Sequence, residues 1–129
     1  MAGPKSVRSD SVQFFLAFHR ETITEAHYFR YYDFHKLCTR TLLVMAERSD
    51  ALRHAVVAFS ALIYSMRIDR TAREQAFLYY AMSIQQLRLL LSEATLDEEA
   101  THMTIATALQ LSSFDVRSVH FFLISAFLW

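Results

Sequence analysis

The chain has 129 residues, 53% of them hydrophobic, and its 13 basic and 13 acidic side chains cancel to a formal net charge of zero. This composition is typical of one globular domain, and a neutral chain has no net field to attract nucleic acid or anionic lipid. Gly3 and Pro4 are its only glycine and proline. Phosphate loops, dinucleotide fingerprints and nucleophile elbows all need glycine, so these enzyme motifs are excluded and helices joined by short polar links are favoured.

The first third of the chain is expected to be mostly helical. Residues 1–10 lack the apolar run of a secretory signal and predict a disordered polar arm. Ser11 is placed to cap a short helix over residues 12–18. A longer helix is expected from Arg20 to Cys38 or beyond.

Aromatic side chains dominate these two helices. A cluster of rings is typical of a helix–helix interface, because each ring buries a large area. A platform that stacks bases or encloses a cation would need basic residues between exposed rings, and only Arg30 and Lys36 lie among them. We therefore favour the interface for the eight rings, which are Phe14, Phe15, Phe18, Tyr28, Phe29, Tyr31, Tyr32 and Phe34.

The clearest helix is predicted over residues 50–66. Its apolar residues recur at helical spacing and form one stripe, which consists of Leu52, Ala55, Val56, Phe59, Leu62, Ile63 and Met66. Ser49 or Asp50 is placed to cap its start, and Arg67 lies near the negative end of the helix dipole.

A polar link over about residues 69–73 leads to a second long helix over residues 74–91. In that helix Ala76 and Ser83 are small enough to permit close approach of a neighbour, on a face that continues through Tyr80, Leu87 and Leu90. Because the link is short, the two helices are expected to pack antiparallel as a helical hairpin.

A third helix is predicted over residues 96–113. Thr95 and Glu98 have the spacing of a capping box at its start. Residues 116–129 then form an apolar run that predicts an atypical C-terminal helix. The most apolar part, residues 119–129, is shorter than the roughly 20 residues that cross a bilayer, so no membrane span is expected.

Three stretches in this order carry a family resemblance. They are SDALRHAVVAFSAL at residues 49–62, EQAFLYYAMSIQQLRLLL at 74–91 and ATALQLSSFD at 106–115. Together they resemble the fungal-specific transcription factor domain, the all-helical regulatory region that accompanies binuclear zinc-cluster DNA-binding domains. The resemblance covers roughly residues 11–115 and implies a regulatory domain in the nucleus, concerned with transcription by RNA polymerase II.

The chain departs from that family in two ways. The zinc cluster of the family needs six cysteines, and Cys38 is the only cysteine here, so no direct DNA binding is expected. The family domain is also far longer, which predicts that residues 11–115 are part of a larger helical domain. After Asp115 the family has a polar loop and a glycine-containing helix, whereas residues 116–129 are apolar and lack glycine.

Catalytic and metal chemistry have little support in the sequence. No two histidines are separated by the three or four residues that place two imidazoles on one helical face, the six being His19, His27, His35, His54, His102 and His120. Cys38 could be served by His35 on one helix, but no glycine-built oxyanion site accompanies it. We therefore expect no enzyme activity, and no catalytic, cofactor-binding or metal-binding residues.

These observations predict an all-α protein of antiparallel helices, either a bundle or stacked hairpins. Its expected partners are other proteins, namely the transcription machinery or regulators of the same type. We also expect the isolated chain to self-associate, because helices of a larger domain would lack packing partners. The alternative is a stand-alone helical adaptor or scaffold with no role in transcription.

Overall fold

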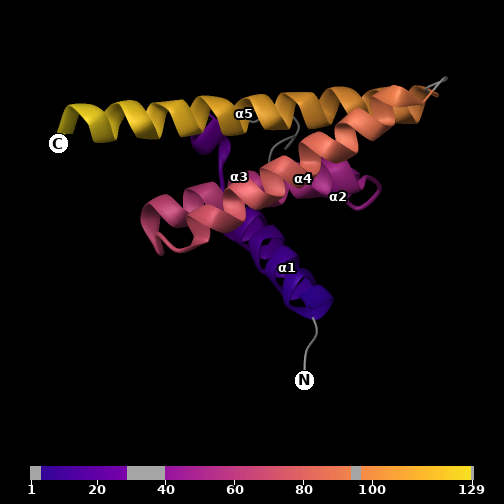
Figure 1. Cartoon of the computed structure of the whole chain (residues 1–129). Coiled ribbons are helices and arrows are strands. Elements are labelled where there is room, and N and C mark those ends of the chain that lie inside the picture. Colours follow the sequence, from indigo (N-terminus) through magenta and orange to yellow (C-terminus); the bar gives the residue numbers. More distant parts are fainter. Residues whose placement is uncertain (1–3, 29–39, 94–96, 129) are drawn as a thin grey trace.

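The computed structural model describes residues 4–28, 40–93 and 97–128. Within these ranges it contains α-helices and one short 3-10 helix but no strand, so the predicted all-α fold is confirmed. In chain order the elements are α1 (Pro4–Thr22), η1 (Glu25–Tyr28), α2 (Leu42–Ala46), α3 (Asp50–Arg67), α4 (Ala72–Ser92) and α5 (Glu98–Leu128). Figure 1 shows α5 lying across α3 and α4, with α1 on the other side of α3.

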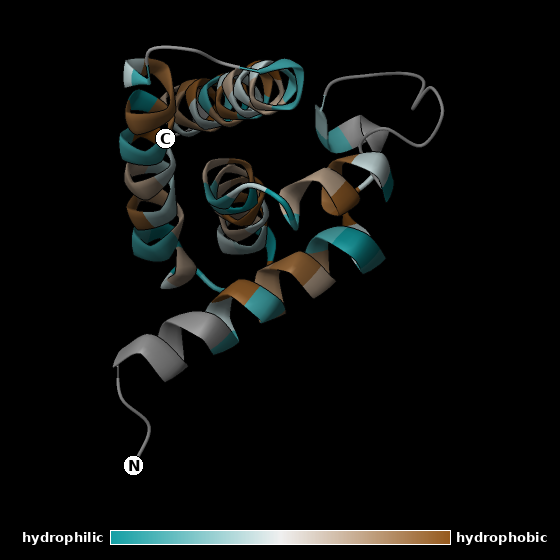
Figure 2. Cartoon of the chain, turned by 90° about the vertical axis from the view of Figure 1, so that its right-hand side faces the viewer, coloured by the Kyte–Doolittle hydropathy of each residue, from teal (hydrophilic) through white to brown (hydrophobic). Residues whose placement is uncertain are grey.

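Helix α3 is the centre of the bundle. It contacts α1, α2, α4 and α5, and Figure 2 shows one helix enclosed by others. The sequence predicted a single apolar stripe on this helix, but the buried surface of the helix is wider than that stripe. Between Ala51 and Ile63 nearly every side chain is buried, because alanines and Ser60 on the remaining sides let neighbouring helices approach there too.

The start of α3 is capped as its sequence predicted, and Arg67 lies in its last turn. The Ser49 side chain accepts a hydrogen bond of 3.3 Å from the backbone N–H of Leu52, which satisfies one free donor of the first turn. At the other end the N–H of Ile68 donates to the Tyr64 carbonyl at 2.8 Å. The predicted helix over residues 50–66 is therefore confirmed to within one residue.

Helices α3 and α4 form the predicted antiparallel hairpin. The link between them is short, and α4 buries Ala72, Ala76, Tyr79 and Ser83. Ser83 donates its hydroxyl to the Ala51 carbonyl of α3 at 2.7 Å, which a larger side chain would prevent. Tyr79, stacked on His54, belongs to this interface, whereas Tyr80 is half-buried and faces α5.

The N-terminal third differs from the prediction. Helix α1 begins at Pro4, so residues 4–10 are helical where a disordered arm was predicted, and Ser11 lies inside the helix and does not cap it. Proline fits the first position of a helix, because its missing N–H has no partner there in any case. The helix expected from Arg20 is also absent over its described part: α1 ends at Thr22 and a separate 3-10 turn follows.

Helix α5 is much longer than predicted. It runs without interruption from Glu98 to Leu128 and takes in residues 116–128, which the sequence predicted as a separate helix. No glycine or proline interrupts this stretch, so nothing ends the helix at Asp115. Asp97 precedes it and accepts the Ala100 N–H at 2.7 Å, as a capping residue does. Thr95, of the predicted capping box, lies outside the described residues.

Candidate functional site

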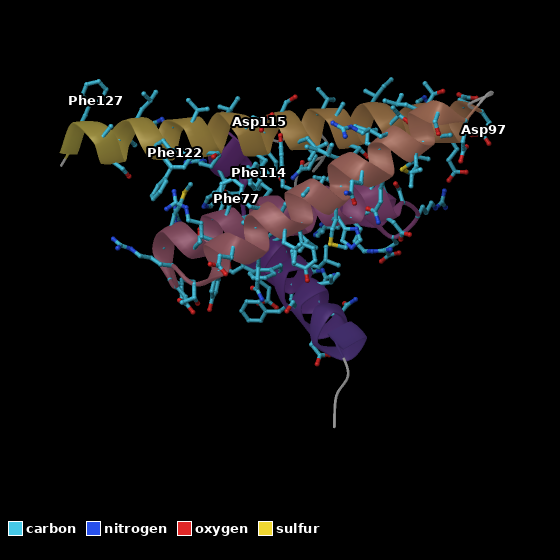
Figure 3. All side chains as sticks on the ribbon, viewed as in Figure 1. Phe77, Asp97, Phe114, Asp115, Phe122 and Phe127 are labelled. Atoms are coloured by element: carbon cyan, nitrogen blue, oxygen red, sulfur yellow. The ribbon has the colours of Figure 1, made fainter. Side chains whose placement is uncertain are left out.

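The inner face of α5 fastens this helix to the hairpin. Its buried residues are Met103, Thr107, Gln110, Leu111 and Phe114. The ring of Phe114 stacks on Tyr80 with centroids 4.5 Å apart and meets Phe77 edge to face at 5.5 Å. Figure 3 shows Phe114 and Phe77 between α5 and α4. This packing fixes the rotation of α5 about its axis and thereby determines which residues face outward.

A buried polar cluster joins α5 to the N-terminal elements. The Tyr28 hydroxyl lies 2.6 Å from Nε2 of His19 and accepts a 2.8 Å hydrogen bond from Nε2 of Gln110. The Tyr28 ring stacks on Phe59 of α3, with 4.3 Å between the centroids. All four side chains are buried. Polar groups in such a place need partners, and here they hold α1, η1 and α5 in one arrangement.

His27 and Arg117 form a second link between η1 and α5. Arg117 donates from Nη2 and Nε to the His27 carbonyl, at 2.6 and 3.2 Å. The His27 ring, only 7% exposed, accepts the Thr24 N–H on Nδ1, while its Nε2 has no hydrogen-bond partner in the described part of the chain. Burial and the nearby charges of Arg67 and Arg117 lower the pKa of His27. Burial and Arg67 likewise lower the pKa of Arg117.

The C-terminal half of α5 borders a basic groove. The Arg73 guanidinium of α4 lies 4.9 Å from the ring centroids of both Phe121 and Phe122, a cation–π geometry. Arg70 also lines this groove, which has a volume of about 420 Å³. Figure 3 places Phe122 on the side of α5 that faces the hairpin, whereas Phe127 projects outward near the end. Arg73 thus holds the far half of α5 against the α3–α4 turn.

An open acidic groove of about 640 Å³ lies on the other side of that turn, between α1 and the start of α4. Asp10, Asp69 and Glu74 contribute carboxylates to its lining beside Phe14 and Tyr64. The Asp69 carboxylate accepts the hydroxyl and N–H of Thr71, and these bonds lower its pKa. This carboxylate therefore stabilises the turn into α4.

The outer face of α5 carries a row of exposed apolar side chains. We define it by Ile105, Leu109, Ser112, Val116, Val119, Leu123 and Ala126. Its five large side chains are each between 53% and 59% exposed, and Phe127 beside it is 86% exposed. In Figure 1 none of the other described helices lies over this side of α5. An apolar face of this extent is typical of an interaction site.

The aromatic cluster predicted as a helix–helix interface is confirmed for Phe15, Phe18 and Tyr28, whereas Phe14 lies at its edge and is 50% exposed. Phe14, Phe15 and Phe18 each meet Tyr64 of α3 edge to face, at 5.3 to 5.8 Å. Phe15 is buried, as is Tyr28, which stacks on α3 further along. The remaining four rings, at positions 29, 31, 32 and 34, lie outside the described residues.

The histidines among the described residues do not gather into a metal site. His19 and His27 are buried in the two polar links described above, and His54 pairs with Gln86 at 2.7 Å. Over residues 4–28, 40–93 and 97–128, no three His, Cys, Asp or Glu side chains gather in a way that could hold a metal ion. The considered pair of Cys38 and His35 lies outside these ranges.

Sequence reasoning missed the outer face of α5. The signal was present, because its positions alternate steps of four and three from Ile105 to Ala126, but the division of the chain at Asp115 hid it. None of the described helices has the length and apolar character needed to cross a membrane. Comparison with known protein families, with curated proteins and with solved structures finds no match to this chain.

Proposed function

We propose that this chain is a regulatory domain that acts by binding other proteins, of the kind found in fungal zinc-cluster transcription regulators. In this proposal it acts in the nucleus, on transcription by RNA polymerase II, and has no catalytic role. The observation that carries the binding role is the exposed apolar outer face of α5. The transcriptional role is supported by the resemblance of residues 49–62, 74–91 and 106–115 to that family.

The positions of these three stretches support a shared role. Residues 49–62 and 74–91 make up most of the α3–α4 hairpin, and residues 106–115 form the part of α5 that packs on it through Phe114. They therefore form one packed unit that presents the outer face of α5 to a partner. A rigid platform of this kind lowers the entropy cost of binding, because little of it has to become ordered.

A tethering experiment tests the transcriptional role. The chain is fused to an unrelated DNA-binding domain and expressed in a fungal reporter strain, where we expect reporter output to change relative to that domain alone. Leu109→Glu places a charge on the outer face of α5 and should abolish the change. Leu89→Glu makes the same substitution at a leucine of α4 that is also more than half exposed, and it should leave the change in output intact.

The competing function is a helical adaptor without a role in transcription. The same apolar face favours it, since a neutral chain with an exposed helix surface can join proteins in any process. Reporter output equal to that of the DNA-binding domain alone, from a fusion that is present in the nucleus, would contradict the transcriptional role and favour the adaptor.

A further inference from the structure

We infer that the outer face of α5 binds the same face of a second copy of this chain, with the two helices antiparallel. The inference deepens the proposed function and rests on it, because it names the occupant of the proposed binding face. Steps that alternate four and three give an apolar repeat of 3.5 residues, which is the period of helices that pair along a shared seam. From Ile105 to Leu123 the seam is about 27 Å long.

The exposed area is close to what a stable dimer needs. The five large residues of the face are joined at its end by Phe127, which is 86% exposed. At roughly 100 Å² for each exposed side chain, the six offer about 600 Å² from each copy and about 1,200 Å² in total, which is the low end of the range for a specific interface. In a dimer, each copy would therefore cover the outer face of α5 of the other copy, and no other helix would be needed.

The face is self-complementary when the helices are antiparallel. A two-fold axis near position 114 places Ile105 opposite Leu123 of the second copy and Leu109 opposite Val119. Ser112 then meets Val116, so no charged side chain enters the seam. An interface of this type uses one patch twice and closes as a dimer.

Charge favours the antiparallel arrangement over the parallel one. Parallel pairing would bring the acidic first turn of α5, with Glu98 and Glu99, against its own copy and would align the two helix dipoles. Antiparallel pairing separates these carboxylates to opposite ends. Asp115, beside the axis, accepts the Tyr80 hydroxyl at 2.7 Å, which turns its charge toward α4 and away from the seam.

A lipid surface is a poorer occupant of this face. Helices that lie on membranes carry several lysines or arginines along their polar side. The only lysine or arginine in the described helix α5 is Arg117, which donates a hydrogen bond to the His27 carbonyl. A protein face of matching period is therefore the better complement.

The mass of the full chain in solution tests this dimer. Sedimentation velocity over a wide concentration range should show twice the chain mass, falling to the chain mass on dilution. Leu109→Glu should weaken association at least about tenfold, because it buries a charge in the seam. Leu89→Glu should associate like the unmodified chain. A chain that stays monomeric throughout, or equal weakening by both variants, would overturn the inference.

Cysteine pairing tests the orientation and does not depend on how Leu109→Glu folds. In a Cys38→Ser background, one tagged chain carries Ile105→Cys and a differently tagged chain carries Leu123→Cys. Oxidation should cross-link the two tags to each other more than either chain to itself. Preferential cross-linking of Ile105→Cys chains to one another would refute the antiparallel arrangement.

The outcomes for this inference and for the proposed function are separable. A monomeric chain whose reporter output still depends on Leu109 would refute the dimer and keep the binding role, with a different protein as partner. A dimeric chain with no effect on the reporter would support the dimer and contradict the transcriptional role.

Discussion

The hydroxyl of Tyr80 on α4 donates a 2.7 Å hydrogen bond to Oδ1 of Asp115 on α5, while the same ring stacks on Phe114. One side chain thus joins two helices by a polar and an apolar contact. Burial, together with the bond to Asp115, raises the pKa of Tyr80 to about 12.

Tyr80→Phe should lower the free energy of unfolding by about 0.5–1.5 kcal/mol, because it removes the hydrogen bond and keeps the ring. Urea denaturation measures the change. Tyr64→Phe is the matched control, since no hydrogen bond is found for the Tyr64 hydroxyl among the described residues. The folded chain holds the Tyr80 proton more firmly, so this contribution is full below about pH 10 and is lost toward pH 12. An equal loss in both variants would contradict the role given to Asp115.

Tyr28→Phe should cost about 1–3 kcal/mol of folding free energy. The substitution keeps the stack on Phe59 but takes away the oxygen that His19 and Gln110 both bond, in a buried place where water does not replace it. Thermal and urea unfolding give the value. A neutral result would show that the polar cluster does not hold α5 in place.

Ala76→Leu should destabilise the chain by about 1–3 kcal/mol through overpacking of the α3–α4 interface. Ala76 is fully buried on α4, in the row that includes Ser83. Ala81→Leu adds the same atoms to the same helix at an exposed position and should change stability little. Chemical denaturation of both variants provides the comparison, and similar losses from both would argue against close packing at Ala76.

Acid should destabilise the chain partly through His27. Folding lowers the pKa of this histidine, so the unfolded chain binds a proton more readily, and stability is lost as the pH falls below the ordinary histidine value of about 6.5. His27→Asn keeps an acceptor for the Thr24 N–H but cannot be charged. Its stability should therefore fall less between pH 7.5 and 5.5 than that of the unmodified chain, as followed by urea unfolding at each pH. If the stability of both proteins fell equally with pH, the acid sensitivity would come from groups other than His27.

The fold of the central hairpin could be predicted from sequence because its signals are local. Ser49 caps α3 through the Leu52 N–H three residues on, and the small residues Ala76 and Ser83 lie at regular helical spacing. The extent of α5 was missed for a different reason. Family resemblance suggested a break at Asp115, whereas the local rule, that a helix continues where nothing stops it, was correct.

The polar links could not be predicted from a single sequence. Arg117 and His27 are 90 residues apart, and nothing near either one shows that they will meet. The end of α1 at Thr22 could not be predicted either. The His27 ring accepts a hydrogen bond from the Thr24 N–H and so stabilises a separate turn there. The outer face of α5 was visible as a pattern, but its exposure depends on how Phe114 orients the helix.

The contact between Tyr28 and Gln110 also bears on the order in which the chain folds. These residues are 82 positions apart, whereas Ser83 and Ala51 of the hairpin are separated by 32. Closing a longer loop costs more chain entropy, so the hairpin should form early and the link to α5 late. Weakening the link between Tyr28 and Gln110 would then speed unfolding more than it slows refolding. The link therefore helps to set the lifetime of the folded state.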